Sequence, residues 1–188
     1  SFLPFALGKL TYSDAKEVGT EGKLLLVARE DGILQGFDIR NRKEIFHLRG
    51  SSALNTCLLV NQHSILAGAE DGLIIHWDIR RNTTSPRSIL QRSHGPITDI
   101  TITRGEAGEF NLLSLLHLLI SVYFSLGHET RCWASTKDGL FFEWDIESQK
   151  ILTELSGADF NAINGIAVHG DLAFAVEKQG ILKYRLSE

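Results

Sequence analysis

EDGLIIHWDI, residues 70–79, places an Asp-Gly pair, a short apolar run and a Trp-Asp pair within ten positions. Asp71, His76 and Asp78 are residue types that form metal or acid–base sites. The same order of residues is also typical of a repeated structural unit. Copies elsewhere in the chain decide between these two interpretations, because internal repeats determine the fold class.

The stretch has three copies elsewhere in the sequence. The full pairs are Asp31-Gly32 with Phe37-Asp38, Asp71-Gly72 with Trp77-Asp78, and Asp138-Gly139 with Trp144-Asp145. A shorter copy runs from Gln179-Gly180 to Tyr184 and lacks both aspartates. The aromatic residues at 37, 77, 144 and 184 are 40, 67 and 40 residues apart. A period of about 40–45 residues is that of four-stranded propeller blades.

The residues around each copy have the pattern of short strands. Apolar runs precede the turns at 23–28, 64–69 and 171–176, and further runs lie upstream at 55–60, 97–102 and 163–168. Asp-Gly between two such runs indicates a hairpin, because glycine accepts the positive φ that the turn requires. The sequence therefore predicts an all-β chain of four repeat units, about 1–39, 40–79, 80–146 and 147–188.

The 67-residue interval exceeds the repeat by 27 residues, and this surplus lies at about 105–131. It contains the apolar run 112–126, which is shorter than the roughly 20 residues needed to cross a bilayer. Three interpretations are open: a helical insertion in the third blade, a membrane anchor, or translated non-coding sequence. The repeat resumes in phase at Cys132, which favours a tolerated insertion or a non-coding segment over a functional helix.

The composition indicates a globular protein and excludes several classes. Of the 188 residues 43% are hydrophobic and 22% charged, and the net charge is −4. This balance argues against a nucleic-acid binder. Cys57 and Cys132 are too few and too far apart for a disulfide framework or a zinc site, which favours a reducing compartment. The absence of methionine predicts that the chain is a fragment or a processed gene model.

The Asp-Gly-x4-Trp-Asp units resemble WD repeats, the blades of a β-propeller. The resemblance implies a seven-bladed ring of which this chain supplies about four blades, with about three missing upstream. It also implies that the outermost strand of the last blade comes from the start of the complete chain. The segments 17–46 and 152–168 further resemble WD-repeat factors that bind ATPase subunits of the proteasome regulatory particle.

That resemblance implies a non-catalytic scaffold or assembly chaperone of the cytoplasm and nucleus. It implies the proteasomal ATPases as partners, with no cofactor, metal, small-molecule substrate, nucleic acid or membrane. The alternative is a substrate receptor of a cullin-type ubiquitin ligase. Such receptors often contain Trp-Asp-x-Arg, which Trp77-Asp78-Ile79-Arg80 matches and Phe37-Asp38-Ile39-Arg40 matches more weakly.

The chemically suggestive residues have a structural interpretation. Asp31, Asp71 and Asp138 recur once per blade and so lie too far apart to share one metal. In WD repeats such an aspartate fixes its turn and accepts a hydrogen bond from a histidine, backed by a hydroxyl and the tryptophan. Thr136 offers the hydroxyl in the third unit, and His94 is the nearest match to the histidine. Strand alternation places His76 on the face of Ile74, opposite Trp77.

The remaining candidates are surface turns. In an up-and-down sheet successive turns alternate between the two ends, so the Asp-Gly turns share one end and the turns after each WD-type strand share the other. The first end should collect Glu30, Glu70 and Asp159. The second should collect cations, namely Arg40, Arg42, Lys43, Arg80, Arg81 and Arg87. We expect the acidic end to contact the ATPases, with ordinary solvated turns as the alternative interpretation.

Overall fold

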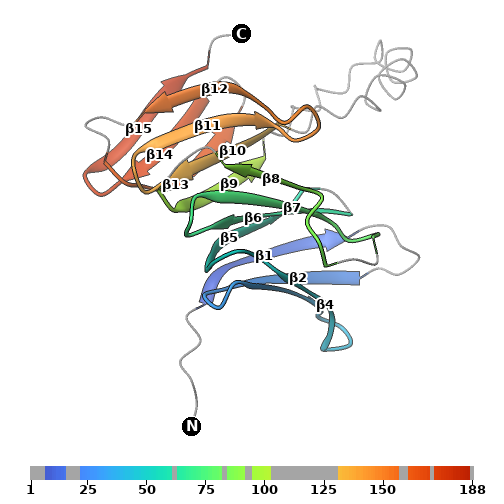
Figure 1. Cartoon of the computed structure of the whole chain (residues 1–188). Coiled ribbons are helices and arrows are strands. Elements are labelled where there is room, and N and C mark those ends of the chain that lie inside the picture. Colours follow the sequence, from blue (N-terminus) through green and yellow to red (C-terminus); the bar gives the residue numbers. More distant parts are fainter. Residues whose placement is uncertain are drawn as a thin grey trace, which may run out of the picture.

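The computed structural model describes residues 7–15, 22–60, 63–81, 84–91, 95–102, 131–156, 161–169 and 172–186, which form strands and turns and no helix. Four antiparallel sheets follow one another along the chain, and Figure 1 shows them side by side as a fan. Sheet A holds β1 (Leu7–Ala15), β2 (Gly22–Arg29), β3 (Ile33–Asp38) and β4 (Lys43–Arg49), and sheet B holds β5 (Leu54–Leu59), β6 (Ser64–Ala69), β7 (Leu73–Asp78) and β8 (Ser88–Gln91). Sheet C holds β9 (Ile97–Ile102), β10 (Arg131–Thr136), β11 (Leu140–Asp145) and β12 (Lys150–Ser156), and sheet D holds β13 (Ile163–His169), β14 (Leu172–Glu177) and β15 (Gly180–Arg185). The predicted all-β architecture of about four blades is confirmed.

Three of the four predicted hairpins have the same turn. The N–H of Gly32, Gly72 and Gly139 donates to the carbonyl three residues earlier, at 3.1, 3.2 and 3.3 Å. Their φ angles are 79°, 80° and 83°, a region in which a Cβ is strained. Glycine is therefore required at the end of each of these turns.

The fourth, degenerate copy forms a different turn. Glu177 pairs directly with Gly180, so only Lys178 and Gln179 connect β14 to β15. Gly180 begins a strand and is not the turn glycine that the alignment with Asp-Gly expects. The fourth copy is one residue shorter than the others because its turn has two residues where theirs have three.

The sheets are offset from the predicted repeat units by one strand. Each predicted unit ends at a WD-type strand, such as β3 or β7. The fourth strand of sheets A, B and C lies at the start of the next unit. In sheet D the described residues form three strands. That its outermost strand comes from the start of the complete chain stays a prediction. The unit bounds and the seven-bladed ring themselves stay predictions.

The predicted helical insertion at 105–131 lies outside the described residues, apart from Arg131 at the start of β10. The two strands that flank it, β9 and β10, are paired neighbours, with Ile102 opposite Cys132. Sheet C therefore has four strands despite the surplus in the sequence.

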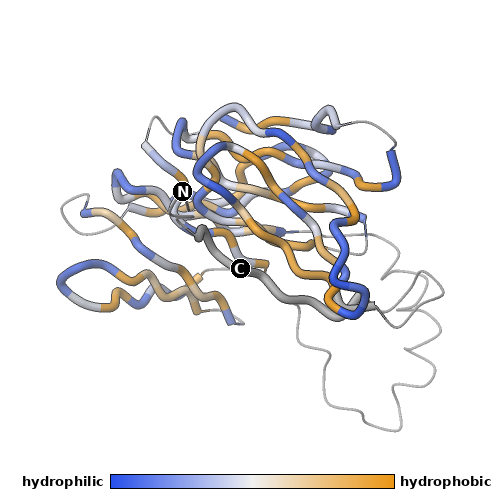
Figure 2. The backbone as a smooth tube through the Cα atoms, turned by 90° about the horizontal axis from the view of Figure 1, so that it is seen from below, coloured by the Kyte–Doolittle hydropathy of each residue, from blue (hydrophilic) through white to orange (hydrophobic). Residues whose placement is uncertain are grey.

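Three apolar cores lie between the four sheets. The core between A and B contains Leu26, Leu34 and Trp77, and the core between B and C contains Leu66 and Trp144. The core between C and D contains Trp133, Phe141 and Ile166. Figure 2 shows hydrophobic residues along the strands and hydrophilic residues at the turns. Each WD-type tryptophan thus packs against the preceding sheet.

The first strands of neighbouring sheets contact one another at the inner side of the fan. The hydroxyl of Thr98 on β9 donates to the carbonyl of Ile163 at 2.6 Å. The carboxylate of Asp99 accepts from the N–H of Ile166 at 3.2 Å. Similarly, the amide of Asn55 on β5 donates to the carbonyl of Ile97 at 3.1 Å. These polar contacts fix the angle between successive sheets, because hydrogen bonds are directional where apolar packing is not.

Candidate interaction surface

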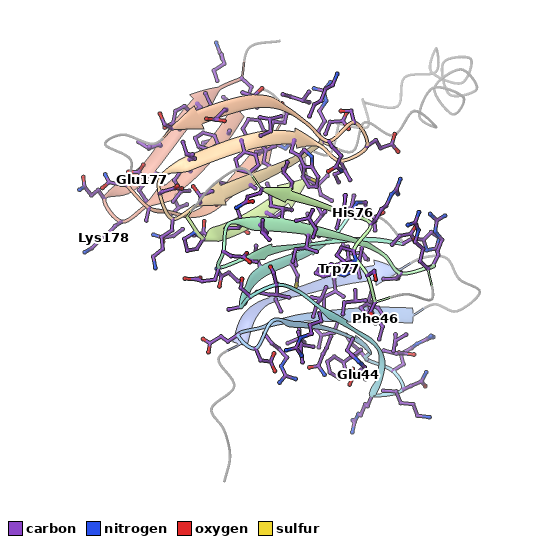
Figure 3. The ribbon with its side chains drawn as sticks, viewed as in Figure 1. Glu44, Phe46, His76, Trp77, Glu177 and Lys178 are labelled. Carbon is purple, nitrogen blue, oxygen red and sulfur yellow. The ribbon has the colours of Figure 1, made fainter. Side chains whose placement is uncertain are left out.

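The turns of the four sheets lie at two opposite ends of the strands. The DG face consists of the turns at 30–32, 70–72, 137–139 and 178–179. The WD face consists of the turns at 39–42, 79–81 and 146–149. Figure 3 labels Glu177 and Lys178 at the DG face and Glu44 toward the opposite end.

In sheet A the DG turn carries an internal ion pair. Asp31 accepts from the guanidinium of Arg29 at 2.5 Å and from the N–H of Ile33 at 3.2 Å. Glu30 is exposed beside them and has no ion pair among the described residues. Of the two acidic residues in this turn, Glu30 is the one available to a partner.

In sheet B the DG turn is tied to the loop before β5 and to β5 itself. The side-chain amide of Asn55 donates to the carboxylate of Glu70 at 2.8 Å, and the N–H of Glu70 donates to the carbonyl of Ala53 at 2.9 Å. Asp71 accepts from the N–H of Leu73 at 3.3 Å. Glu70 is exposed and held in place by these contacts, so its charge has a defined position.

In sheet C a threonine changes the role of the aspartate. The Thr136 hydroxyl donates to the carboxylate of Asp138 and accepts from the N–H of Leu140 at 3.0 Å. In sheets A and B the equivalent N–H, of Ile33 or Leu73, donates to the aspartate of the turn itself. Asp138 is thereby released toward Gly95, where a Cβ would lie only 2.8 Å from its carboxyl carbon. The partner expected from the sequence, His94, lies outside the described residues.

Only the DG turns of sheets A and B have an acidic residue in their first position. The position held by Glu30 and Glu70 is Lys137 in sheet C and Lys178 in sheet D, and both lysines are exposed. Asp159, the third acidic residue predicted for this face, lies outside the described residues. The DG face therefore has an acidic half in sheets A and B, and a second half in sheets C and D where exposed lysines stand at this position and Asp138 adds one negative charge. Sequence reasoning grouped the acidic turns and overlooked the lysines at the equivalent positions of the other two.

At the WD face each aspartate caps the turn that follows its strand. Asp38 accepts from the N–H of Arg40 at 2.9 Å, and Asp145 accepts from the N–H of Glu147 at 2.8 Å. Such local bonds are the usual reason for aspartate before a turn. The geometry that these turns share thus comes from the aspartate, and the charge of the face comes from the residues after it.

Arg80 is bound to Asp78 by two bonds. Its Nε and Nη2 donate to the two carboxylate oxygens at 3.0 and 2.7 Å. These bonds from Arg80 hold the pKa of Asp78 well below its usual range. Arg40 reaches Asp38 only at 3.9 Å. Of the two arginines that follow a WD-type aspartate by two residues, Arg80 is largely neutralised and Arg40 is the more available to a partner.

His76 is a packed residue of β7 and does not belong to either face. Its side chain is 2% exposed, and its Nδ1 lies 3.4 Å from the hydroxyl of Ser88 on β8. Gln149 of sheet C donates to the same hydroxyl at 3.1 Å. Burial, followed by the positive charge of Arg87, lowers the pKa of His76 to about 4. Trp77 points to the opposite side, into the core with sheet A, as strand alternation predicts (Figure 3).

The tryptophans contribute packing and not hydrogen bonds. The indole N–H groups of Trp77, Trp133 and Trp144 are buried without a hydrogen-bond partner in the described part of the chain. These residues therefore do not form the hydrogen bond that was expected between a tryptophan and the aspartate network. All three side chains are fully buried, so they stabilise the fold by the large apolar area that they remove from water.

The described residues contain no group of three or more His, Cys, Asp or Glu side chains arranged to hold a metal ion. Burial raises the pKa of Cys132 to about 12, which keeps its sulfur protonated and unreactive. Within the same ranges no helix has the length and apolarity to cross a membrane.

Comparison with known proteins gives relatives of one kind. No family model matches the chain. It is 31% identical over 176 residues to human proteasomal ATPase-associated factor 1, covering 92% of this chain and 38% of the human protein. It is 28% identical over 179 residues to the probable proteasomal ATPase-associated factor 1 of Dictyostelium discoideum, covering 90% of this chain and 37% of that protein. The chain is homologous to part of proteasomal ATPase-associated factor 1.

The chicken proteasomal ATPase-associated factor 1 is 44% identical over 85 residues, which cover 45% of this chain and 21% of that protein. The chain thus spans less than two-fifths of the length of these relatives.

Solved structures support the fold alone. The designed protein Ika4 superposes with a TM-score of 0.69 at 15% identity, covering 97% of this chain and 92% of that chain. A chain of the mitotic checkpoint complex superposes with a TM-score of 0.70 at 14% identity, covering 96% of this chain and 48% of that chain. Together with the four antiparallel sheets, they show a WD-repeat type of propeller arrangement in this chain.

Proposed function

We propose that this chain is the propeller portion of a proteasome-associated assembly factor that binds ATPase subunits of the regulatory particle. The observation that carries the proposal is its similarity, over about nine-tenths of its length, to factors named for those ATPases. The role is that of a non-catalytic scaffold in the cytoplasm and nucleus. It requires only exposed side chains on a rigid framework, which the sheet ends provide.

The contact surface is the acidic half of the DG face. Glu30 and Glu70 stand at equivalent turns of neighbouring sheets, and the framework beneath them is fixed by the turn hydrogen bonds. Adjacent carboxylates of this kind attract a basic surface and accelerate its association. Lys137 and Lys178 repel the same surface at the other end of the arc, which orients the partner.

Capture of purified regulatory-particle ATPases by the immobilised chain tests this proposal. The variant Glu30→Lys with Glu70→Lys should weaken capture about tenfold, because exposed charge pairs contribute roughly 0.5–1 kcal/mol each. The loss should shrink as the salt concentration rises. Glu147→Lys, on the WD face, is the matched control and should change capture less than about twofold. Equal capture by the double variant and the wild type would refute the acidic half as the site.

The cullin-receptor alternative has its own outcome in the same experiment. Binding of a cullin adaptor from cell extract, abolished by Arg80→Ala, together with no capture of the ATPases, would replace the proposed function. Failure of the wild-type chain to capture any purified ATPase subunit would contradict the proposal itself and not merely its site.

A further inference from the structure

The outer strands of sheets A, B and C share a pattern that neither the turns nor the cores explain. Each has a cation near the WD face, at its first residue or just before it, and two residues later an aliphatic side chain that faces solvent. The pairs are Lys43 with Ile45, Arg87 with Ile89, and Lys150 with Leu152. These six residues form what we term the outer rim, and β4, β8 and β12 follow one another in Figure 1.

The aliphatic residues of the outer rim are strongly exposed. Ile45 is 59% exposed, Ile89 52% and Leu152 46%. They account for three of the six exposed large hydrophobic residues found in the described ranges. Exposed apolar side chains that recur at one place in successive sheets indicate a contact surface, whereas scattered ones need no explanation.

A β-bulge exposes two of these side chains. Phe37 pairs with Glu44 and Gly36 with Phe46, so Ile45 is the extra residue of β4. Leu152 is the extra residue of β12 for the same reason, between the partners of Trp144 and Glu143. Bulges and lysines can also protect an edge strand from pairing with other chains. That role does not account for an isoleucine or leucine at the bulge, because an exposed aliphatic side chain favours association.

The cations of the outer rim are uncompensated. Lys43, Arg87 and Lys150 form no ion pair among the described residues. The carboxylate of Glu44, next to Lys43, is held by the amide of Gln35 at 3.2 Å and by His47 at 3.3 Å. In sheet C, Glu147 shares a turn with Lys150, so the positive charge is concentrated on sheets A and B.

We propose that the outer rim binds an extended, acidic segment of a partner protein that also carries aliphatic side chains. Its carboxylates pair with the cations, and its aliphatic residues cover Ile45 and Ile89. Packed sheets lie about 10 Å apart where their faces meet, and the outer strands of a fan lie further apart than the inner ones. An extended chain advances about 3.3 Å per residue, so acidic residues more than about three positions apart match neighbouring sheets. This surface lies away from the DG face and is independent of the ATPase proposal.

A protein segment fits the outer rim better than a nucleic acid. The exposed large hydrophobic residues of the described chain are all aliphatic, so they offer no aromatic platform for base stacking. Three cations interrupted by aliphatic side chains also give a short positive track, whereas a nucleic-acid site follows the phosphate backbone over a longer one.

Fluorescence polarisation with a labelled peptide of repeated Glu-Leu-Ser tests the inference on the full chain. Wild type should bind this peptide more tightly than peptides of repeated Lys-Leu-Ser or Glu-Ser-Ser. Lys43→Glu with Arg87→Glu should weaken binding about tenfold, from two exposed charge pairs of roughly 0.5–1 kcal/mol each. Ile45→Ser with Ile89→Ser should weaken it by a similar factor, because the covered apolar area is lost.

Lys137→Glu with Lys178→Glu makes the same charge change on the DG face and should alter binding less than about twofold. Every variant changes exposed residues, and unchanged tryptophan fluorescence shows that the cores are intact. The inference is overturned if wild type does not prefer the Glu-Leu-Ser peptide, if the DG-face control loses as much binding, or if single-stranded DNA competes equally well. Lys150→Glu with Leu152→Ser gives a further check, since sheet C should contribute a smaller loss.

Discussion

The hydroxyl of Thr136 should be a major source of stability in sheet C, and Thr136→Val measures it. This change keeps the shape of the side chain and removes only its hydrogen bonds. Thr136 is fully buried, and its hydroxyl donates to Asp138 while accepting from Leu140. The variant therefore removes two contacts from the turn that joins β10 to β11.

The expected loss follows from what each contact contributes. A hydrogen bond to a charged group is worth about 1.5–3 kcal/mol, and an unsatisfied buried N–H costs about 1–3 kcal/mol. Two features of the structure reduce the sum. Asp138 is exposed, so water replaces part of the lost bond, and its carboxylate can take over the N–H of Leu140 as Asp71 does for Leu73 in sheet B. We expect Thr136→Val to lower the free energy of unfolding by about 2 kcal/mol.

Urea denaturation followed by the fluorescence of the three buried tryptophans is the assay. The free energy of unfolding falls by about 2–3 kcal/mol per molar urea, so the urea concentration at the midpoint of unfolding should fall by about 0.7–1 M. Thr136→Ser keeps the hydroxyl and loses one methyl group, which should cost only about 1 kcal/mol. Equal stability of the valine and serine variants, or a valine variant within about 0.5 kcal/mol of wild type, would show that the hydroxyl does not fix this turn.

Two other perturbations test the packing of β3 and β7. The pKa of His76 is lowered to about 4 in the folded chain, below the value of about 6.5 expected when unfolded, so its contribution to stability is complete above pH 6.5 and is lost as the pH falls to about 4. Between pH 7.5 and pH 4.5 the wild type should therefore lose about 2 kcal/mol more than His76→Gln in urea titrations, and parallel losses would contradict the assignment. A Cβ on Gly36 would lie 2.3 Å from the ring of Phe46, so Gly36→Ala should destabilise the chain by about 1–2 kcal/mol. Gly165→Ala, whose Cβ would meet only Asp99 at 3.6 Å, is the control and should stay within about 0.5 kcal/mol of wild type.

Much of the fold could be predicted from local sequence because its signals are local. Asp-Gly turns, apolar runs and the 40-residue period each depend on residues close together in the chain, and the strands appear where these signals place them. The same reasoning identified His76 as a strand residue facing away from Trp77. The degenerate fourth turn was misaligned, because a two-residue turn places Gly180 in a strand and the sequence pattern alone does not reveal this.

The sequence by itself determined the number of sheets, the glycines that end their turns and the alternation of side chains, since backbone sterics and the period of a strand act between neighbours in the chain. Only the tertiary structure decided which charges remain available. Asp78 neutralises Arg80, Gln35 and His47 hold Glu44, and Lys137 and Lys178 share the DG face with Glu30 and Glu70. It also decided how the sheets are joined, through Thr98 and Asp99 to the backbone of β13. Contacts of this kind join residues more than sixty positions apart, and their energies depend on distances and burial that no local pattern encodes.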